Sequence, residues 1–234
     1  MAGAPDMIRF ALAPQRAMFA LEFIDPIRGD RVGTGLRVAA AGLAPPALTP
    51  SNRFVWLDRG PPEERRIRVE AISVDGRFAP FEDMLRVPAH EEGVKASALL
   101  FRRRLRPTGL YEPPTGMIAV GGMLVEDDGS PAVAVAGARI RIQFRYAEDL
   151  ETFSGCTAVS DPKGRFIAVV RRLGDVRPDP DRQFPGTFRA WLRLKRGGEV
   201  RVSPAFSLPL GRLTRMAAPL QWAKLGLREI DEDA

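Results

Sequence analysis

Polar and apolar residues alternate along much of this chain with a period of two. Positions 139–146 read Arg-Ile-Arg-Ile-Gln-Phe-Arg-Tyr, and positions 66–71, 189–195 and 199–202 repeat the alternation. Successive side chains of a β-strand point to opposite faces, so each of these runs would place one apolar face against a core. Positions 17–24 are more continuously apolar, which is typical of a central strand. The pattern therefore predicts an all-β protein.

Turn residues separate these predicted strands. Gly197-Gly198 lies between two alternating runs and fits a two-residue hairpin loop, because glycine tolerates a positive φ. Asp75-Gly76 and Asp128-Gly129 are further turn candidates, and Asp161-Pro162-Lys163-Gly164 has the proline and glycine positions of a type I turn. Helical periodicity is scarce, and its best short candidates are residues 80–85 and 213–225.

A stretch rich in proline and glycine divides the chain near its middle. Residues 107–116 lack alternation and read as a stiff, extended linker. We expect two tandem β-sandwich domains of Ig-like or transthyretin-like type, at 1–106 and 117–212, because each has the usual size of such a sandwich. Residues 213–234 follow as a separate segment. Faint similarities between the halves leave open whether the first domain is a duplicate of the second.

The second half carries a series of short motifs in a fixed order. They are Gly121-Gly122, Asp127-Asp128-Gly129-Ser130-Pro131, Val135-Ala136-Gly137-Ala138-Arg139-Ile140 and Ser160-Asp161-Pro162-Lys163-Gly164-Arg165-Phe166-Ile167. Together, over residues 121–170, they resemble the carboxypeptidase regulatory-like (transthyretin-type) β-sandwich family. The inserted residues 132–134 and Ser160, where the family usually has threonine, depart from its pattern. The resemblance implies a fold and no activity, because this family is an accessory module found beside many functions.

The positive charge of the chain is carried almost entirely by arginine. The 234 residues include 35 basic and 29 acidic ones, for a net charge of +6, and only four of the basic residues are lysines. The arginines are spread along the chain, so nucleic acid is an improbable partner. A mutational bias toward arginine codons and an arginine-rich contact surface both remain open. The run 101–106 likewise reads as a basic strand edge or as a nucleic-acid contact.

The residues that most catalytic sites require are missing from the sequence. The chain has one histidine, His90, and one cysteine, Cys156, too few for the usual zinc ligand sets. A Ser-His-Asp triad would have to use His90, yet the sequence has no Gly-x-Ser-x-Gly motif to supply the serine. Phosphate and dinucleotide loops are absent as well. Asp127-Asp128 and Asp179-Pro180-Asp181 are read as turn residues. We therefore expect no enzyme activity, no catalytic residue, no cofactor and no metal.

Cysteine content and hydrophobic patterning also bear on the compartment. A single cysteine allows no internal disulfide, which fits a reducing compartment. The sequence shows no signal peptide and no apolar run long enough to span a membrane. A cytoplasmic location is predicted, and later release as part of a particle remains open.

One predicted strand carries a candidate contact surface. Alternation over residues 189–195 places Arg189, Trp191, Arg193 and Lys195 on one face. Tryptophan and arginine are enriched among the residues that dominate binding energy at protein interfaces. Trp191 is expected either to contact a protein partner or to be covered by the C-terminal segment or the other domain.

The segment 213–234 carries a second candidate surface. It contains Leu220, Trp222, Leu225 and Leu227, followed by an acidic patch at 229–233. It is expected either to be a docking arm that lies on a neighbouring subunit or adds a strand to it, or to form the last strand of the second sandwich.

These observations favour a non-enzymatic structural or adaptor protein. We expect it to dock onto protein partners in a multi-subunit assembly, a homo-oligomer among the possibilities. A phage-tail-like or contractile-injection-type particle is the nearest analogy at the level of fold. A carbohydrate-binding module is the first alternative, although it needs exposed aromatic platforms and Trp56 lies in a run that reads as buried. A carboxylate-based hydrolase is the second, and it needs two acids facing each other across a cleft. The sequence does not reveal the partner, the stoichiometry or the orientation of the domains.

Overall fold

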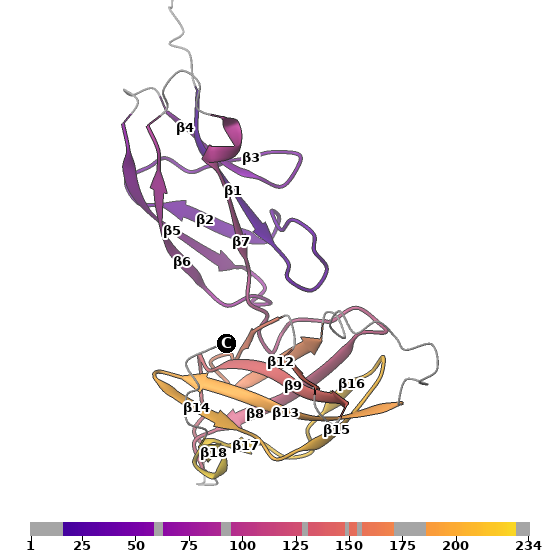
Figure 1. The fold of residues 1–234 in the computed structure, drawn as a ribbon. Coiled ribbons are helices and arrows are strands. Elements are labelled where there is room, and N and C mark those ends of the chain that lie inside the picture. Colours follow the sequence, from indigo (N-terminus) through magenta and orange to yellow (C-terminus); the bar gives the residue numbers. More distant parts are fainter. Residues whose placement is uncertain are drawn as a thin grey trace, which may run out of the picture.

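The computed structural model describes residues 16–58, 63–89, 95–127, 131–147, 150–153, 156–170 and 186–227. In these ranges every regular element is a β-strand or a short 3-10 turn, which confirms the all-β prediction. The strands form two lobes, one above the other in Figure 1, and each sheet contains strands of one lobe only. The described residues contain no helix of the length and hydropathy that a membrane span requires.

The first lobe consists of two sheets. The four-stranded sheet has the order β3 (Ala47–Leu48), β4 (Phe54–Asp58), β1 (Arg16–Ile24), β7 (Leu100–Arg104). The three-stranded sheet has the order β2 (Leu36–Ala40), β5 (Arg65–Ser73), β6 (Phe81–Val87), and the 3-10 turn η1 (Ala96–Leu99) leads into β7. Strand β1 pairs with β4 on one side and with β7, in parallel, on the other, which confirms its central position.

The core of the first lobe lies between these two sheets. From β1 it takes Phe19, Leu21 and Phe23, each fully buried, and from β5 it takes Val69. Phe19 stacks on Trp56, with ring centroids 4.5 Å apart, so Trp56 is buried as its sequence context predicts. Side chains from both sheets thus form one cluster, as in a β-sandwich.

Two of the elements expected from the sequence are different in the structure. The short helix considered at 80–85 is strand β6, in which Leu85 and Val87 are buried and Arg86 between them is exposed. The second helix candidate, 213–225, contains two short strands and a single 3-10 turn. In both segments, pairing with a neighbouring strand satisfies backbone hydrogen bonds and part of the apolar surface is buried, although Met84 and Leu213 remain exposed.

The second lobe is also built from two layers of sheet. The larger sheet has the order β10 (Leu150–Phe153), β9 (Arg139–Ala147), β13 (Thr187–Arg196), β14 (Glu199–Val202), β18 (Gly226–Leu227), with β11 (Ala158–Val159) on β9 and β15 (Phe206–Pro209) on β13. The smaller one has the order β12 (Arg165–Val170), β8 (Ile118–Val125), β16 (Leu213–Arg215), with β17 (Leu220–Gln221) also on β8. The 3-10 turn η2 (Trp222–Lys224) joins β17 to β18. Ile142, Phe144 and Leu192 of the larger sheet meet Val120 and Phe166 of the smaller one in a common core.

Three predicted turns are confirmed. Gly197-Gly198 joins β13 to β14 as a two-residue hairpin loop, with Gly197 at a φ of 59°. Asp75-Gly76 turns the chain between β5 and β6, with Gly76 at a φ of 72°. In the third turn the Gly164 N–H donates to the Asp161 carbonyl at 2.8 Å. Asp128-Gly129 lies outside the described residues.

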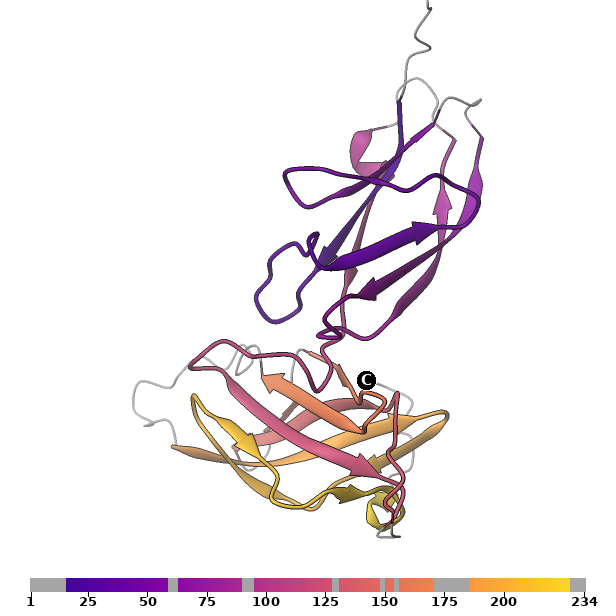
Figure 2. The same ribbon diagram turned by 180° about the vertical axis from the view of Figure 1, so that it is seen from behind.

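The connection between the lobes is packed against both of them. Its Pro107, Thr108 and Tyr111 are buried, and the Tyr111 hydroxyl donates to Asp25 Oδ2 of the first lobe at 2.7 Å. The Val159 N–H of the second lobe donates to the Pro107 carbonyl at 2.8 Å. Figure 2 shows this connection from behind, between the two lobes. The boundary at 107–116 stays a prediction.

The lobes also contact each other directly. The Cys156 thiol of the second lobe donates to the Pro26 carbonyl of the first at 3.3 Å, and Cys156 is only 4% exposed, which confirms it as a small buried residue. Ala119, Ile167 and Val169 of the second lobe belong to the same apolar cluster as the core of the first. The two lobes therefore share buried apolar surface.

Candidate protein interface

The outer face of β13 carries the first group of predicted contact residues. Ala190, Leu192 and Leu194 are fully buried in the core, while Arg189 and Lys195 are exposed and Trp191 and Arg193 are half-buried. The predicted alternation of the strand is thus confirmed. Their function as an interface stays a prediction.

Strand β9 places further basic residues directly opposite these. The register of the two strands pairs Arg193 with Arg141 and Lys195 with Arg139, and Arg189 pairs with another arginine at position 145. Like charges directly opposite each other on a sheet are destabilising by a few tenths of a kcal/mol to about 1 kcal/mol. The sequence showed that the residues of β9 alternate, but the pairing partner of a strand cannot be read from alternation. The contribution of β9 to this face was therefore missed.

A groove beside Trp191 has its origin in a departure of the chain from the sheet. Strands β14 and β15 both pair with β13, and residues 203–205 between them bulge outward. The bulge is held by Ser203, whose N–H donates to the Leu192 carbonyl at 2.9 Å and whose Oγ accepts from the Leu192 N–H at 2.9 Å. The resulting groove has a volume of about 500 Å³. It is lined by Arg189, Trp191, Val202, Ser203, Pro204, Ala205, Lys224 and Gly226.

This groove brings the two predicted surfaces together. Lys224 and Gly226 of the C-terminal segment form one wall and Trp191 of β13 another, so the segment borders Trp191 without covering it completely. Trp191, Arg193 and Arg141 also interact within the chain. Covering of Trp191 by the segment is therefore only partial, and contact of Trp191 with a protein partner stays a prediction.

The expectation of a free docking arm is wrong for the part of the segment that the structure describes. Trp222 and Leu225 are 5% and 6% exposed and belong to the core of the second lobe, and the half-buried Leu220 packs against it. Strand β17 pairs with β8 and β18 pairs with β14, so this part completes the second sandwich. Burying a tryptophan and two leucines stabilises the fold far more than leaving them in water. Of the four predicted residues, Leu227 alone is exposed, at 74%, and the acidic patch 229–233 lies outside the described residues.

Polar contacts hold Trp222 in this position. Its indole Nε1–H donates to Glu199 Oε2 at 3.3 Å, and the Arg201 guanidinium carbon lies 5.2 Å from the centre of the ring system. Arg201 also donates to the Trp222 carbonyl. A buried indole needs a hydrogen-bond acceptor, and Glu199 provides it.

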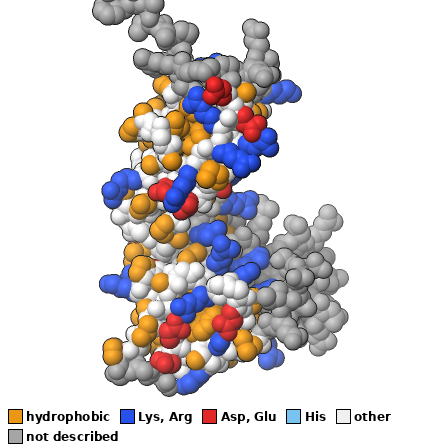
Figure 3. Space-filling view, turned by 90° about the vertical axis from the view of Figure 1, so that its left-hand side faces the viewer, with side chains coloured by type: hydrophobic (Ala, Val, Ile, Leu, Met, Phe, Trp, Pro, Cys, Tyr) orange, Lys and Arg blue, Asp and Glu red, His pale blue; other side chains and the backbone are white. Residues whose placement is uncertain are grey.

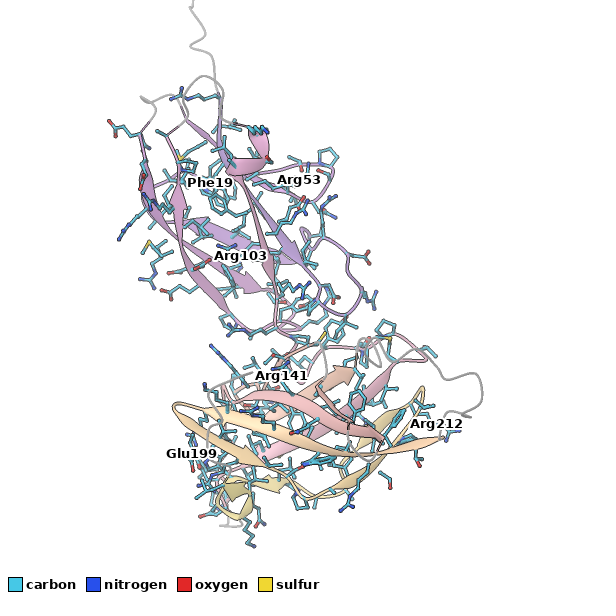
Figure 4. All side chains as sticks on the ribbon, in the orientation of Figure 1. Phe19, Arg53, Arg103, Arg141, Glu199 and Arg212 are labelled. Atoms are coloured by element: carbon cyan, nitrogen blue, oxygen red, sulfur yellow. The ribbon has the colours of Figure 1, made fainter. Side chains whose placement is uncertain are left out.

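The basic face continues toward the first lobe. Burial and the nearby positive charge of Arg139 both lower the pKa of Arg106, which follows β7, so these two arginines lie close enough to repel each other. Arg141 lies on the side of the second lobe that is nearer to the first (Figure 4). On the side of the molecule shown in Figure 3, Lys and Arg side chains occur on both lobes and outnumber Asp and Glu.

The described carboxylates that are buried have structural partners. Asp25 and Asp161 accept backbone N–H groups in turns, at 2.8 Å from Ile27 and from Lys163. Within the described ranges no three His, Cys, Asp or Glu side chains gather in a way that could hold a metal ion. His90 and the stretch 179–181 lie outside the described residues. The described carboxylates therefore do not favour the hydrolase alternative.

An exposed aromatic platform is not seen in the part of the chain that the structure describes. Trp56 and Tyr111 are each 2% exposed and Trp222 is 5% exposed, which leaves Trp191 as the one tryptophan with a partly open ring. Carbohydrate-binding modules stack sugar rings on exposed aromatic side chains, so these positions do not favour that alternative.

Comparison with known proteins gives little guidance. No protein-family model matches this chain. No curated protein matches it either. Among solved structures it is similar to the structure of a streptococcal ancillary pilin, with 14% sequence identity, a TM-score of 0.27, and coverage of 92% of this chain and 63% of the pilin chain. The chain thus spans less than two thirds of the length of that protein, and a similarity this low carries no argument about function.

Proposed function

We propose that this chain is a structural or adaptor protein that docks onto an acidic protein partner through the outer face of β9 and β13. The observation that carries the proposal is the placement of basic side chains opposite one another, Arg193 with Arg141 and Lys195 with Arg139, beside the half-buried Trp191. Acidic side chains of a partner would relieve the repulsion within this face. Trp191 and its groove would add apolar contact area.

The chemistry of the face suits a protein partner. Guanidinium groups bind carboxylates with two parallel hydrogen bonds, and a hydrogen bond to a charged group contributes about 1.5–3 kcal/mol. The strand below the face is fixed by Ala190, Leu192 and Leu194 in the core, so its side chains need little reorganisation on binding. An interface with an aromatic centre and charged surroundings is the usual arrangement of a binding hot spot.

The finer proposals rest on the sequence alone. They are that the chain has no catalytic activity, that its second half is of the carboxypeptidase regulatory-like type, and that its assembly is phage-tail-like or of the contractile-injection type. A cytoplasmic site of assembly belongs with them, because the chain has a single cysteine, which fits a reducing compartment.

A pull-down with matched variants tests the docking face. The tagged chain is expressed at native level and recovered from nuclease-treated extract. Three proteins are compared: the wild type, the variant Arg139→Glu with Lys195→Glu, and the variant Arg37→Glu with Arg66→Glu. The last pair changes two exposed arginines of the first lobe by the same amount of charge. We expect the first pair to reduce recovery of a co-purifying protein at least tenfold and the control pair to leave it unchanged.

Two results would overturn this proposal. One is equal recovery of partners by all three proteins at an unchanged melting temperature. The other is loss of the partner on nuclease treatment alone, which would identify nucleic acid as the bound species. Arg139→Gln with Lys195→Gln removes the charges without introducing acids, and it guards against a variant that fails to fold.

A further inference from the structure

A buried glutamate organises three arginines on the outer face of the first lobe. Glu22 of β1 is 1% exposed although it points away from the core. Its Oε1 accepts from Arg53 Nε at 2.6 Å and lies 2.9 Å from Arg31 Nε, and its Oε2 accepts from Arg102 Nε at 2.9 Å. One carboxylate therefore fixes the positions of three guanidinium groups.

Each of these arginines approaches Glu22 through Nε and remains partly exposed. The side chains of Arg31, Arg53 and Arg102 are 40%, 35% and 67% exposed. A guanidinium has five N–H donors, and Arg53 and Arg102 each donate one of them to Glu22. Three positive charges around one negative charge leave an excess of two. The cluster is thus arranged to accept a further carboxylate.

The cluster lies between a basic groove and an apolar cleft. The groove, about 560 Å³ in volume, is lined by Arg31, Arg102 and Arg104 among others. The cleft, also about 560 Å³, is lined largely by apolar side chains that include Ala20, Val55 and Leu100. The register of β1 and β7 sets Leu100, Arg102 and Arg104 beside alternate residues of β1, so they follow one another along one face.

The spacing of this face defines the ligand that would fit it. Residues two apart on a strand are about 6.6 Å apart, since each residue advances the chain by about 3.3 Å. An extended segment that binds here would have an apolar side chain, then an acidic one two positions later, then another acidic one after two more. Edge pairing is not required, and Arg103 partly blocks it by donating to the Arg102 carbonyl at 3.0 Å and to Asp83 Oδ2 at 2.6 Å.

The chain itself contains a segment of this kind. Leu227, Glu229 and Asp231 stand at alternate positions, and Asp233 continues the series. Leu227 is 74% exposed, the highest exposure among the large hydrophobic residues described. Aligned in parallel, the order apolar–acidic–acidic matches Leu100, Arg102 and Arg104.

Leu227, where this segment begins, does not contact the first lobe of its own molecule. Leu227 is held in β18 by pairing with Arg201 of β14, and β18 lies at the end of the second lobe that is remote from the first (Figure 1). We propose that the outer face of β1 and β7 binds residues 227–233 of a second copy of this chain. Such head-to-tail contacts use two different surfaces and join copies in a row. This inference concerns the first lobe and does not rest on the docking face of β9 and β13.

Self-association of the full chain, measured by sedimentation velocity from 1 to 200 µM, tests the proposal. We expect the wild type to self-associate at low salt and to dissociate as salt rises, because exposed charges are screened. An acceptor variant, Arg102→Glu with Arg104→Glu, and a donor variant, Glu229→Lys with Asp231→Lys, should each associate at least tenfold more weakly. Mixing the two variants should restore association, because the two unchanged surfaces pair with each other and the two charge-reversed surfaces pair with each other.

Further variants distinguish this site from contacts made elsewhere on the chain. A variant that combines the four substitutions of the acceptor and donor variants should regain self-association, because its two altered surfaces again carry opposite charges. Leu227→Asp should weaken self-association without a change in melting temperature, because Leu227 is exposed. Arg139→Glu with Lys195→Glu should leave association unchanged. A wild type that is monomeric at 200 µM and low salt would overturn the proposal. So would association that requires Arg139 and Lys195 but not Arg102 and Arg104, because the acidic segment would then bind the second lobe.

Discussion

At the scale of single residues, Gly164 illustrates how a turn is fixed by its surroundings. It has a φ of 74°, and a Cβ atom at this position would lie 2.2 Å from the Leu124 carbonyl oxygen of the neighbouring strand. Asp161 organises the same turn, since its Oδ1 accepts the N–H groups of Lys163 and Arg165 at 2.8 and 2.9 Å. Both the conformation and the close approach therefore require glycine here.

We predict that Gly164→Ala destabilises the chain by more than about 3 kcal/mol, because strain at positive φ adds to a backbone clash. Gly42→Ala is the matched control. Gly42 has a φ of 73°, but an added Cβ meets nothing within 4 Å, so a loss of about 1 kcal/mol is expected. Urea unfolding of both variants gives the comparison. Equal losses of stability in the two variants would show that the close approach of Gly164 to Leu124 does not contribute to the effect.

Glu22 connects residue chemistry to the pH dependence of stability. Burial alone would raise its pKa, but the hydrogen bonds from Arg53 and Arg102 and the charge of Arg31 outweigh burial and lower the pKa below its ordinary value of 4.5. A lowered pKa in the folded state means that ionised Glu22 stabilises the fold. This stabilisation is complete above the ordinary pKa and is lost as the pH falls through the lower folded value.

We expect Glu22→Gln to reduce the free energy of unfolding by about 2 kcal/mol at pH 7, because hydrogen bonds to a charged group are lost. Below pH 4.5 the difference in free energy of unfolding between Glu22→Gln and wild type should shrink, since protonation then removes the negative charge of Glu22 in the wild type too. Glu70→Gln, in an exposed ion pair with Arg68, should change stability by less than about 0.5 kcal/mol. A difference for Glu22→Gln that stays constant from pH 7 to pH 3 would contradict this interpretation.

At the scale of elements, the segment from β17 to β18 completes the second sandwich. Trp222 and Leu225 are buried in its core, while Leu227 two residues later is exposed. We predict that Trp222→Ala and Leu225→Ala each destabilise the chain by about 2–5 kcal/mol, as large-to-small changes in a core do. Leu227→Ala should change stability by less than about 0.5 kcal/mol. Thermal unfolding distinguishes these values, and a stable Trp222→Ala variant would revive the idea of an arm.

The long strands could be predicted because burial on one face imposes a period of two. This holds for β5, β9 and β13, in which the apolar residues of one face, such as Val69, Ile142 and Leu192, are buried in a core. Strands β16, β17 and β18 have only two or three residues, too few to show any period. Strand β6 was mistaken because its polarity does not follow its burial: burial alternates along the whole strand, but Asp83 lies on the inward side and Met84 is exposed.

The candidate sites depend on pairing, which one sequence does not contain. The basic residues of β13 could be found from alternation, but their neighbours on β9 required the register. Glu22 stands in an apolar run, and its arginine partners come from other parts of the chain. A lone acid within an apolar strand was the one signal that could have indicated this cluster.

At the scale of the whole molecule, the lobes are coupled through buried contacts. The Tyr111 hydroxyl binds Asp25 across the junction, and the shared apolar cluster includes Ile167 and Val169. We predict a single transition in calorimetry, and a loss of about 1–3 kcal/mol for Tyr111→Phe, which leaves a buried oxygen of Asp25 without its donor. Leu110→Ala, at an exposed neighbouring position, should have little effect. Two well-separated transitions in the wild type would show that the lobes unfold independently.

The docking face of β9 and β13 is the central claim, and the four lysines of the chain allow a direct measurement of it. Lys195 and Lys224 lie on or beside this face, whereas Lys95 and Lys163 lie elsewhere, and all four are exposed. Amine-reactive cross-linking at native concentration, followed by mass spectrometry, locates the partner. We predict cross-links to other proteins at Lys195 and Lys224. Cross-links confined to Lys95 and Lys163 would contradict the proposed docking face.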